Sequence, residues 1–156
     1  MKIKSVVVNN KAKALEIETV KGLFRLPFAK LRLKPSSRSK ISEIFVDKEM
    51  ASQGITYRLE SGEEDSIHLD AFLDYNRDPD YMRAILLHKL TVEAEKKMKL
   101  SGLSKHEVIR RLKTSPSQLY RLLDPTNNKK SVDEMLRLIS VLGYSVELNL
   151  VENVAY

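Results

Sequence analysis

The spacing of apolar residues changes at Asp78-Pro79, and this change limits the folds open to the chain. Before it, short runs alternate apolar with polar residues, which is the period of a half-buried β-strand. After it, apolar residues recur every three or four positions, as on one face of a helix. Asp is a favourable helix N-cap and Pro is tolerated at the first helical position, so a helix is expected to begin here. The pattern predicts an α+β protein with a small antiparallel β domain at 1–77 and a helical domain at 78–156.

The first domain is expected to hold six short strands separated by polar turns. A loop over residues 34–40 has Pro, Ser and basic residues but no apolar one, so it is predicted to be exposed. The strands are predicted around residues 3–8, 15–19, 23–26, 44–46, 55–59 and 67–69.

A terminal strand is predicted at Ser145–Val151, where Val146, Leu148 and Leu150 alternate with polar residues. Such a strand needs a hydrogen-bonding partner. Two partners are considered, the β domain of the same chain and a second copy of the chain.

Three short helices in the second domain are each expected to open with a capping box. In this motif a Ser oxygen accepts from the third amide of the helix, and a Glu or Gln three residues later reaches back. The pairs are Ser104/Glu107, Ser115/Gln118 and Ser131/Glu134. Only Lys113 and Thr114 separate the first helix from the cap of the second, a spacing typical of a helix-turn-helix.

The second of these helices has two distinct faces. Leu119 and Leu122 are predicted to face the core, which leaves Ser117, Tyr120 and Arg121 outward near the helix N-terminus. An Arg can donate two hydrogen bonds to a guanine edge, a Ser can contact several bases, and a Tyr can contact a thymine methyl or a phosphate. These three residues are the predicted base-facing set.

This region resembles the lambda-repressor-like (Xre-type) family of helix-turn-helix regulators, which includes antitoxins of toxin–antitoxin operons. The resemblance covers about residues 77–150 and rests on the leucine spacing above and on segments 119–125 and 135–143. It implies a recognition helix at 116–123 in the major groove and a homodimer bound to paired half-sites. It also implies DNA-backbone contacts from Lys105, Ser115, Asn127, Asn128, Lys129 and Lys130.

Lys113 stands where the family usually has Gly, which implies a left-handed backbone conformation there. Ile109 stands where the family usually has a small Ala. The N-terminal domain resembles small domains of unknown function fused to such regulators, and this likeness implies no activity.

Charge and composition favour a polyanionic partner in a reducing compartment. The net charge is +6, with basic residues concentrated at 21–40 and 96–113. The chain has no Cys and no early apolar run long enough for a signal peptide or a membrane span, so a cytoplasmic location without membrane association is expected.

Catalysis and cofactor binding have no motif to support them. No nucleophile–base pair and no Gly-rich phosphate loop is recognisable. His68, His88 and His106 are scattered and lack ligand spacing, so no metal is expected either. The chain is therefore predicted not to be an enzyme and to use no cofactor.

The leading hypothesis is a transcriptional regulator that binds double-stranded DNA. One alternative is an antitoxin that neutralises a toxin protein and autoregulates its operon. Another is a protein-interaction adaptor that binds no DNA.

Overall fold

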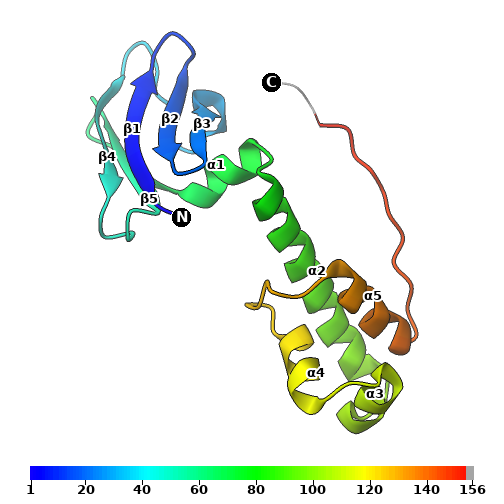
Figure 1. Cartoon of the computed structure of the whole chain (residues 1–156). Helices are drawn as coiled ribbons and strands as arrows, with labels where there is room; N and C mark the ends of the chain where they lie inside the picture. Colours follow the sequence, from blue (N-terminus) through cyan, green and yellow to red (C-terminus); the bar gives the residue numbers. More distant parts are fainter. Residues whose placement is uncertain (154–156) are drawn as a thin grey trace. The chain divides into compact units, whose positions relative to one another are not determined.

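The computed structural model describes residues 1–153 of the chain (Figure 1). The chain divides into two compact units, Met1–Met82 and Arg83–Tyr156. The division falls inside a helix rather than at the predicted position 77/78. The physical reason is Tyr81, which packs against the core of the first unit from the first turn of that helix. The class is α+β, as predicted, and the described residues form five α-helices and two small antiparallel sheets.

The first unit contains all six predicted strands, arranged as two three-stranded sheets with β2 and β5 in the middle (Figure 1). A one-turn 3-10 helix, Phe28–Lys30, follows the first sheet. The strands are β1 (Ile3–Asn9), β2 (Ala14–Thr19), β3 (Gly22–Pro27), β4 (Ile41–Asp47), β5 (Gly54–Leu59) and β6 (Glu64–His68).

Alternation along the two middle strands places every second side chain in one shared core. Leu15 and Ile17 of β2 and Ile55 and Tyr57 of β5 are fully buried. The Tyr57 hydroxyl donates to the backbone oxygen of Leu33, so the buried phenol keeps a hydrogen-bond partner. The core is therefore formed by residues of both sheets.

Helix α1 (Leu69–Tyr75) was not predicted, because Leu69 was assigned to the last strand. His68 caps this helix, its Nδ1 accepting from the amide of Asp70 at 3.2 Å. Leu69, Phe72 and Leu73 are all buried, and their spacing of three and four is a helical signal. The helix closes the core of the first unit.

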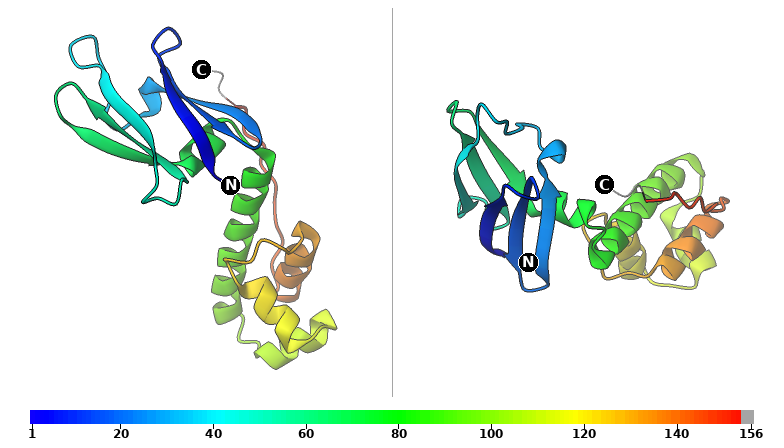
Figure 2. Two further views of the ribbon diagram at one scale, coloured as in Figure 1. Left: turned by 60° about the vertical axis from the view of Figure 1, so that its left-hand side comes forward. Right: turned by 90° about the horizontal axis from the view of Figure 1, so that it is seen from above.

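The second unit is helical, with α3, α4 and α5 gathered beside the C-terminal part of α2 (Figure 2). Helix α2 begins at the predicted position, where the Asp78 carboxylate accepts from the amide of Tyr81 at 3.0 Å. The unit's core includes Leu87 and Ala94 of α2. The helices are α2 (Pro79–Leu100), α3 (Lys105–Leu112), α4 (Pro116–Leu123) and α5 (Val132–Val141).

The capping prediction is correct for the Ser residues and only partly correct for their partners. Ser104, Ser115 and Ser131 each accept from the amide three residues later. Only Ser131 has the return hydrogen bond, from its amide to Glu134. Glu107 turns instead to two Arg side chains and Gln118 to Arg121, because guanidinium groups within reach are stronger donors.

The predicted terminal strand at Ser145–Val151 is not formed within the single chain. After α5 the described chain, to residue 153, is extended but has no ladder partner. Leu148 and Leu150 are 84% and 85% exposed. Alternation gives this segment an apolar side, but a strand forms only where a second strand accepts its backbone hydrogen bonds.

Candidate nucleic-acid interface

A three-residue turn, Lys113 to Ser115, joins α3 to α4. Lys113 has φ 52° and ψ 48°, so the predicted left-handed conformation is confirmed. Its amide donates to the backbone oxygen of Arg110, and the Thr114 amide donates to that of Ile109. These hydrogen bonds end α3 abruptly, so α4 starts in a new direction without a longer loop.

Helix α4 is held by its inner face and exposed on the other. Leu119 is 1% exposed and Leu122 is 6% exposed, both within the core of the second unit. Ser117 lies on the exposed side beside the cap, its hydroxyl 3.1 Å from that of Ser115. Tyr120 is 58% exposed. The predicted orientation of Ser117 and Tyr120 is therefore confirmed.

Lys105 and Tyr120 bring α3 and α4 together at the surface. The Lys105 ammonium lies over the Tyr120 ring, 5.0 Å from its centre. This distance is within the range of a cation–π contact. A cation and an exposed aromatic ring thus lie side by side next to the N-terminal part of α4.

Arg121 does not have the freedom that its helical position suggested. Its side chain is only 27% exposed and forms an ion pair with Glu134 of α5. It also donates to the Gln118 side chain at 2.8 Å and to the backbone oxygen of Lys129 at 3.1 Å. Its long side chain folds back onto acceptors of its own unit, so it ties α4 to α5 instead of presenting a guanidinium to a base.

Lys130 is buried and therefore cannot contact a phosphate as predicted. It is 2% exposed, and its ammonium donates to the backbone oxygens of Leu122 and Asp124 at 2.8 and 2.9 Å. Burial lowers its pKa below the ordinary value. The residue caps the C-terminal end of α4, where free carbonyl groups attract a cation.

The rest of the loop before α5 is more open. Lys129 and Asn128 are exposed, so their side chains can reach a ligand. Asn127 is partly buried, and its side-chain oxygen accepts from the Lys129 amide at 2.9 Å. Of the residues predicted to contact the DNA backbone, four are exposed: Lys105, Ser115, Asn128 and Lys129. Lys130 is buried and Asn127 is partly buried, and both form hydrogen bonds that stabilise the loop.

Comparisons of the chain with known proteins found no match among family models, curated proteins or solved structures. The geometry of the second unit therefore carries the argument about function.

Charge is unequally divided between the two units. Residues 83–156 hold 13 basic and 8 acidic residues, a net charge of +5, whereas residues 1–82 hold 14 basic and 13 acidic residues. Within the predicted basic run at 21–40, three cations are paired with carboxylates. Lys21 pairs with Asp78 and Asp80, Arg25 with Glu16, and Arg32 with Asp65.

Glu107 neutralises part of the basic cluster on α3. Arg110 and Arg111 both donate to its carboxylate, and these hydrogen bonds lower its pKa to about 2. The carboxylate therefore stays ionised at neutral pH. Its negative charge offsets part of the positive charge of Arg110 and Arg111, which the sequence analysis counted in full. Lys105 and Lys113 are the exposed cations of α3 and its turn with no carboxylate among their contacts in residues 1–153.

A shallow hollow of about 250 Å³ lies beside α4 and was not predicted. Lys113, Gln118 and Arg137 line part of it, and all three are exposed. Gln118 was considered only as a capping partner and Lys113 only as a turn residue. The sequence places Gln118 in the first turn of α4, three residues after Ser115. This position could have indicated that Gln118 lies at the candidate interface.

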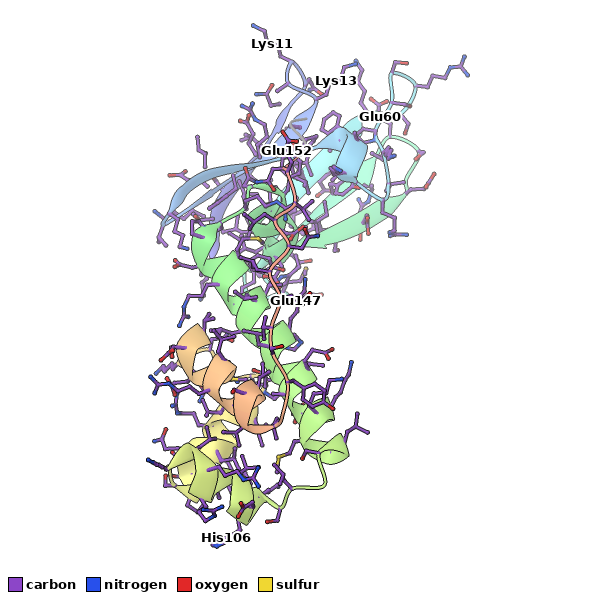
Figure 3. All side chains as sticks on the ribbon, turned by 90° about the vertical axis from the view of Figure 1, so that its right-hand side faces the viewer. Lys11, Lys13, Glu60, His106, Glu147 and Glu152 are labelled. Carbon is purple, nitrogen blue, oxygen red and sulfur yellow. The ribbon has the colours of Figure 1, made fainter. Side chains whose placement is uncertain are left out.

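The histidines form no site. His68 caps α1, the Nδ1 atom of His88 lies 3.4 Å from the Pro125 oxygen, and His106 points into solvent from α3 (Figure 3). Residues 1–153 contain no group of three His, Cys, Asp or Glu residues close enough to hold a metal ion. No helix in that range is apolar over the length that a bilayer requires.

Proposed function

We propose that the chain binds double-stranded DNA sequence-specifically, as a transcriptional regulator of the lambda-repressor-like helix-turn-helix type. One observation carries the proposal. A short, capped helix is held by Leu119 and Leu122 and exposes Ser117 and Tyr120 on its opposite side. A helix presented in this way fits the major groove, which is wide enough to admit it.

Each exposed residue has a distinct role in this proposal. Ser117 and Tyr120 contact base edges. Lys105 and Lys129 contact phosphates on either side of the groove. The Ser117 amide binds a phosphate beside Ser115, since Pro116 has no N–H and the Gln118 amide already donates to the Ser115 side chain. Arg121 orients α4 through Glu134 and makes no base contact.

A dimer is part of the proposal because one copy reads too little DNA. Helix α4 has eight residues, about 12 Å at 1.5 Å per residue. A helix of this length spans three or four base pairs, and two copies on half-sites about one turn apart would double the contacts.

The experiment is selection of duplexes from a random pool by the full chain, followed by affinity measurements at several salt concentrations. We expect an enriched sequence with two related halves. We also expect log K to fall linearly with log salt, with a slope of about −0.9 for each phosphate neutralised. An adaptor that acts only on proteins would enrich nothing and bind no duplex, and that result would refute the proposal.

A further inference from the structure

The segment Ser145–Val151 is the most apolar exposed stretch of the second unit. Seven large apolar side chains after Leu100 are exposed in the described part of that unit, and five lie between Tyr144 and Val151. The chain is extended after α5 (Figure 1), and Figure 3 shows Glu147 on this segment. Exposed apolar side chains in such a concentration usually mark an interaction surface.

The order of residues in this segment is complementary to itself. Antiparallel pairing of two copies centred on Leu148 places Val146 opposite Leu150 and Glu147 opposite Asn149. The three apolar side chains of each copy then share one face, because successive side chains alternate between faces. No two carboxylates face each other. Parallel pairing in register would instead set Glu147 against Glu147, which is unfavourable.

We propose that Ser145–Val151 is a dimerisation strand that pairs antiparallel with the same segment of a second copy. The helices of its own unit offer no strand edge within residues 83–153, and a second copy of the segment can supply the missing backbone partners. Seven residues is an ordinary strand length. The proposed DNA binding needs a dimer but not this particular interface, so this interface can be refuted while a dimer formed through another surface still binds DNA. A dimer formed through this segment can likewise exist without binding DNA.

Cysteine cross-linking tests the register directly, because the chain has no cysteine of its own. In full-length Leu148→Cys the two sulfurs belong to directly opposed residues, whose Cα atoms are about 4.5–5.5 Å apart in antiparallel pairs. This separation suits a disulfide. Mild oxidation should therefore convert most of the Leu148→Cys protein to a covalent dimer.

Val146→Cys is the matched control. Its two copies sit four residues out of register, about 14 Å apart, so they should cross-link at least tenfold less. Adding Leu150→Cys to Val146→Cys should restore the covalent dimer. Efficient cross-linking of both single variants would indicate parallel strands or random collision and would overturn the proposal.

Charge substitutions give a second readout by analytical ultracentrifugation. Asn149→Lys sets a cation opposite Glu147 at both ends and should lower the dimer Kd about threefold or more, whereas Asn149→Glu should raise it by a similar factor. Leu148→Asp puts two carboxylates at the centre and should yield monomers with unchanged circular dichroism. A wild-type chain that is monomeric at 100 times the concentration used for DNA binding, or a dimer insensitive to Leu148→Asp, would refute the interface.

Discussion

The Lys105 ammonium of α3 lies over the ring of Tyr120 on α4, 5.0 Å from its centre. The ring is still 58% exposed, so the contact does not remove it from solvent. A cation held against an exposed aromatic ring is suited to a ligand that has both negative charge and flat or methylated groups. The proposed DNA surface depends on this pair more than on the Arg that follows it.

Tyr120→Ala should weaken binding to the selected duplex about tenfold, or 1.4 kcal/mol. The free energy of unfolding should change by less than about 0.5 kcal/mol, because the side chain is largely exposed. Tyr144→Ala is the matched control. Tyr144 is also exposed and lies under a Lys, with Lys97 4.7 Å from its ring centre, but it is not on α4. Equal losses of affinity in the two variants would contradict the assigned surface.

Arg121→Ala should lower the free energy of unfolding by about 1–2 kcal/mol, because it leaves Glu134 without its strongest donor. Although burial acts to raise the pKa of Glu134, the hydrogen bond from Arg121 holds it below its ordinary value. Chemical denaturation measures the change. Arg137→Ala, which breaks an exposed pair with Asp133, should cost less than about 0.5 kcal/mol. An Arg121 variant as stable as wild type but poor in DNA binding would restore Arg121 to the base-facing set.

Lys130→Met and Lys129→Met make the same change at adjacent positions with opposite expectations. Lys130→Met removes two hydrogen bonds to the end of α4 and should destabilise the second unit by about 1–3 kcal/mol. Lys129→Met should leave stability unchanged and reduce the salt slope of duplex binding by about 0.9. Denaturation and binding titrations of both variants separate the two roles. A loss of stability in Lys129→Met together with a reduced salt slope in Lys130→Met would contradict these two roles.

Lys113→Gly should stabilise the second unit by about 0.5–1 kcal/mol, since Gly adopts a positive φ without the strain that a side chain imposes. Lys113→Ala removes the same charge while retaining a Cβ, so it should give no gain. Thermal unfolding of both variants measures the difference. A gain in the Ala variant would show that charge, not backbone conformation, limits stability at the turn.

Lowering the pH should reduce the stability of the folded protein partly through protonation of Glu107. Its pKa falls from 4.5 to about 2 on folding because of hydrogen bonds from Arg110 and Arg111. A carboxyl with a lowered folded pKa contributes stability above pH 4.5 and loses it as pH falls toward 2. Glu107→Gln should therefore reduce the drop in melting temperature between pH 5 and about 2. Glu152→Gln, in the exposed C-terminal segment, should not alter that drop.

The strands were predictable because alternation reports directly which side chains a sheet can bury. Leu15 and Ile17 illustrate this, since both are fully buried as the pattern requires. The same rule failed at Leu148, because alternation does not show whether a second strand is present. Helix α1 was missed although Leu69, Phe72 and Leu73 have helical spacing, since Leu69 also continues the alternation of β6.

The sequence predicted the orientation of those site residues whose side chains follow the direction of their Cα–Cβ bond on the helix. The Ser117 side chain is short and the Tyr120 side chain is rigid, so their positions on the helix determine that both are exposed. Arg121 and Lys130 have long side chains that reach acceptors up to 13 residues away in the sequence, such as Glu134. Helical spacing does not describe these contacts, because they depend on how the loop between α4 and α5 folds.

The unequal distribution of charge has a consequence for how encounters begin. Residues 83–153 have a net charge of +5 and would attract a polyanion from a distance, whereas residues 1–82 have nearly equal numbers of basic and acidic residues. Attraction of this kind acts over about 8–10 Å at moderate salt. The helical unit would thus meet a polyanion before the β unit does, and raising the ionic strength would slow this association.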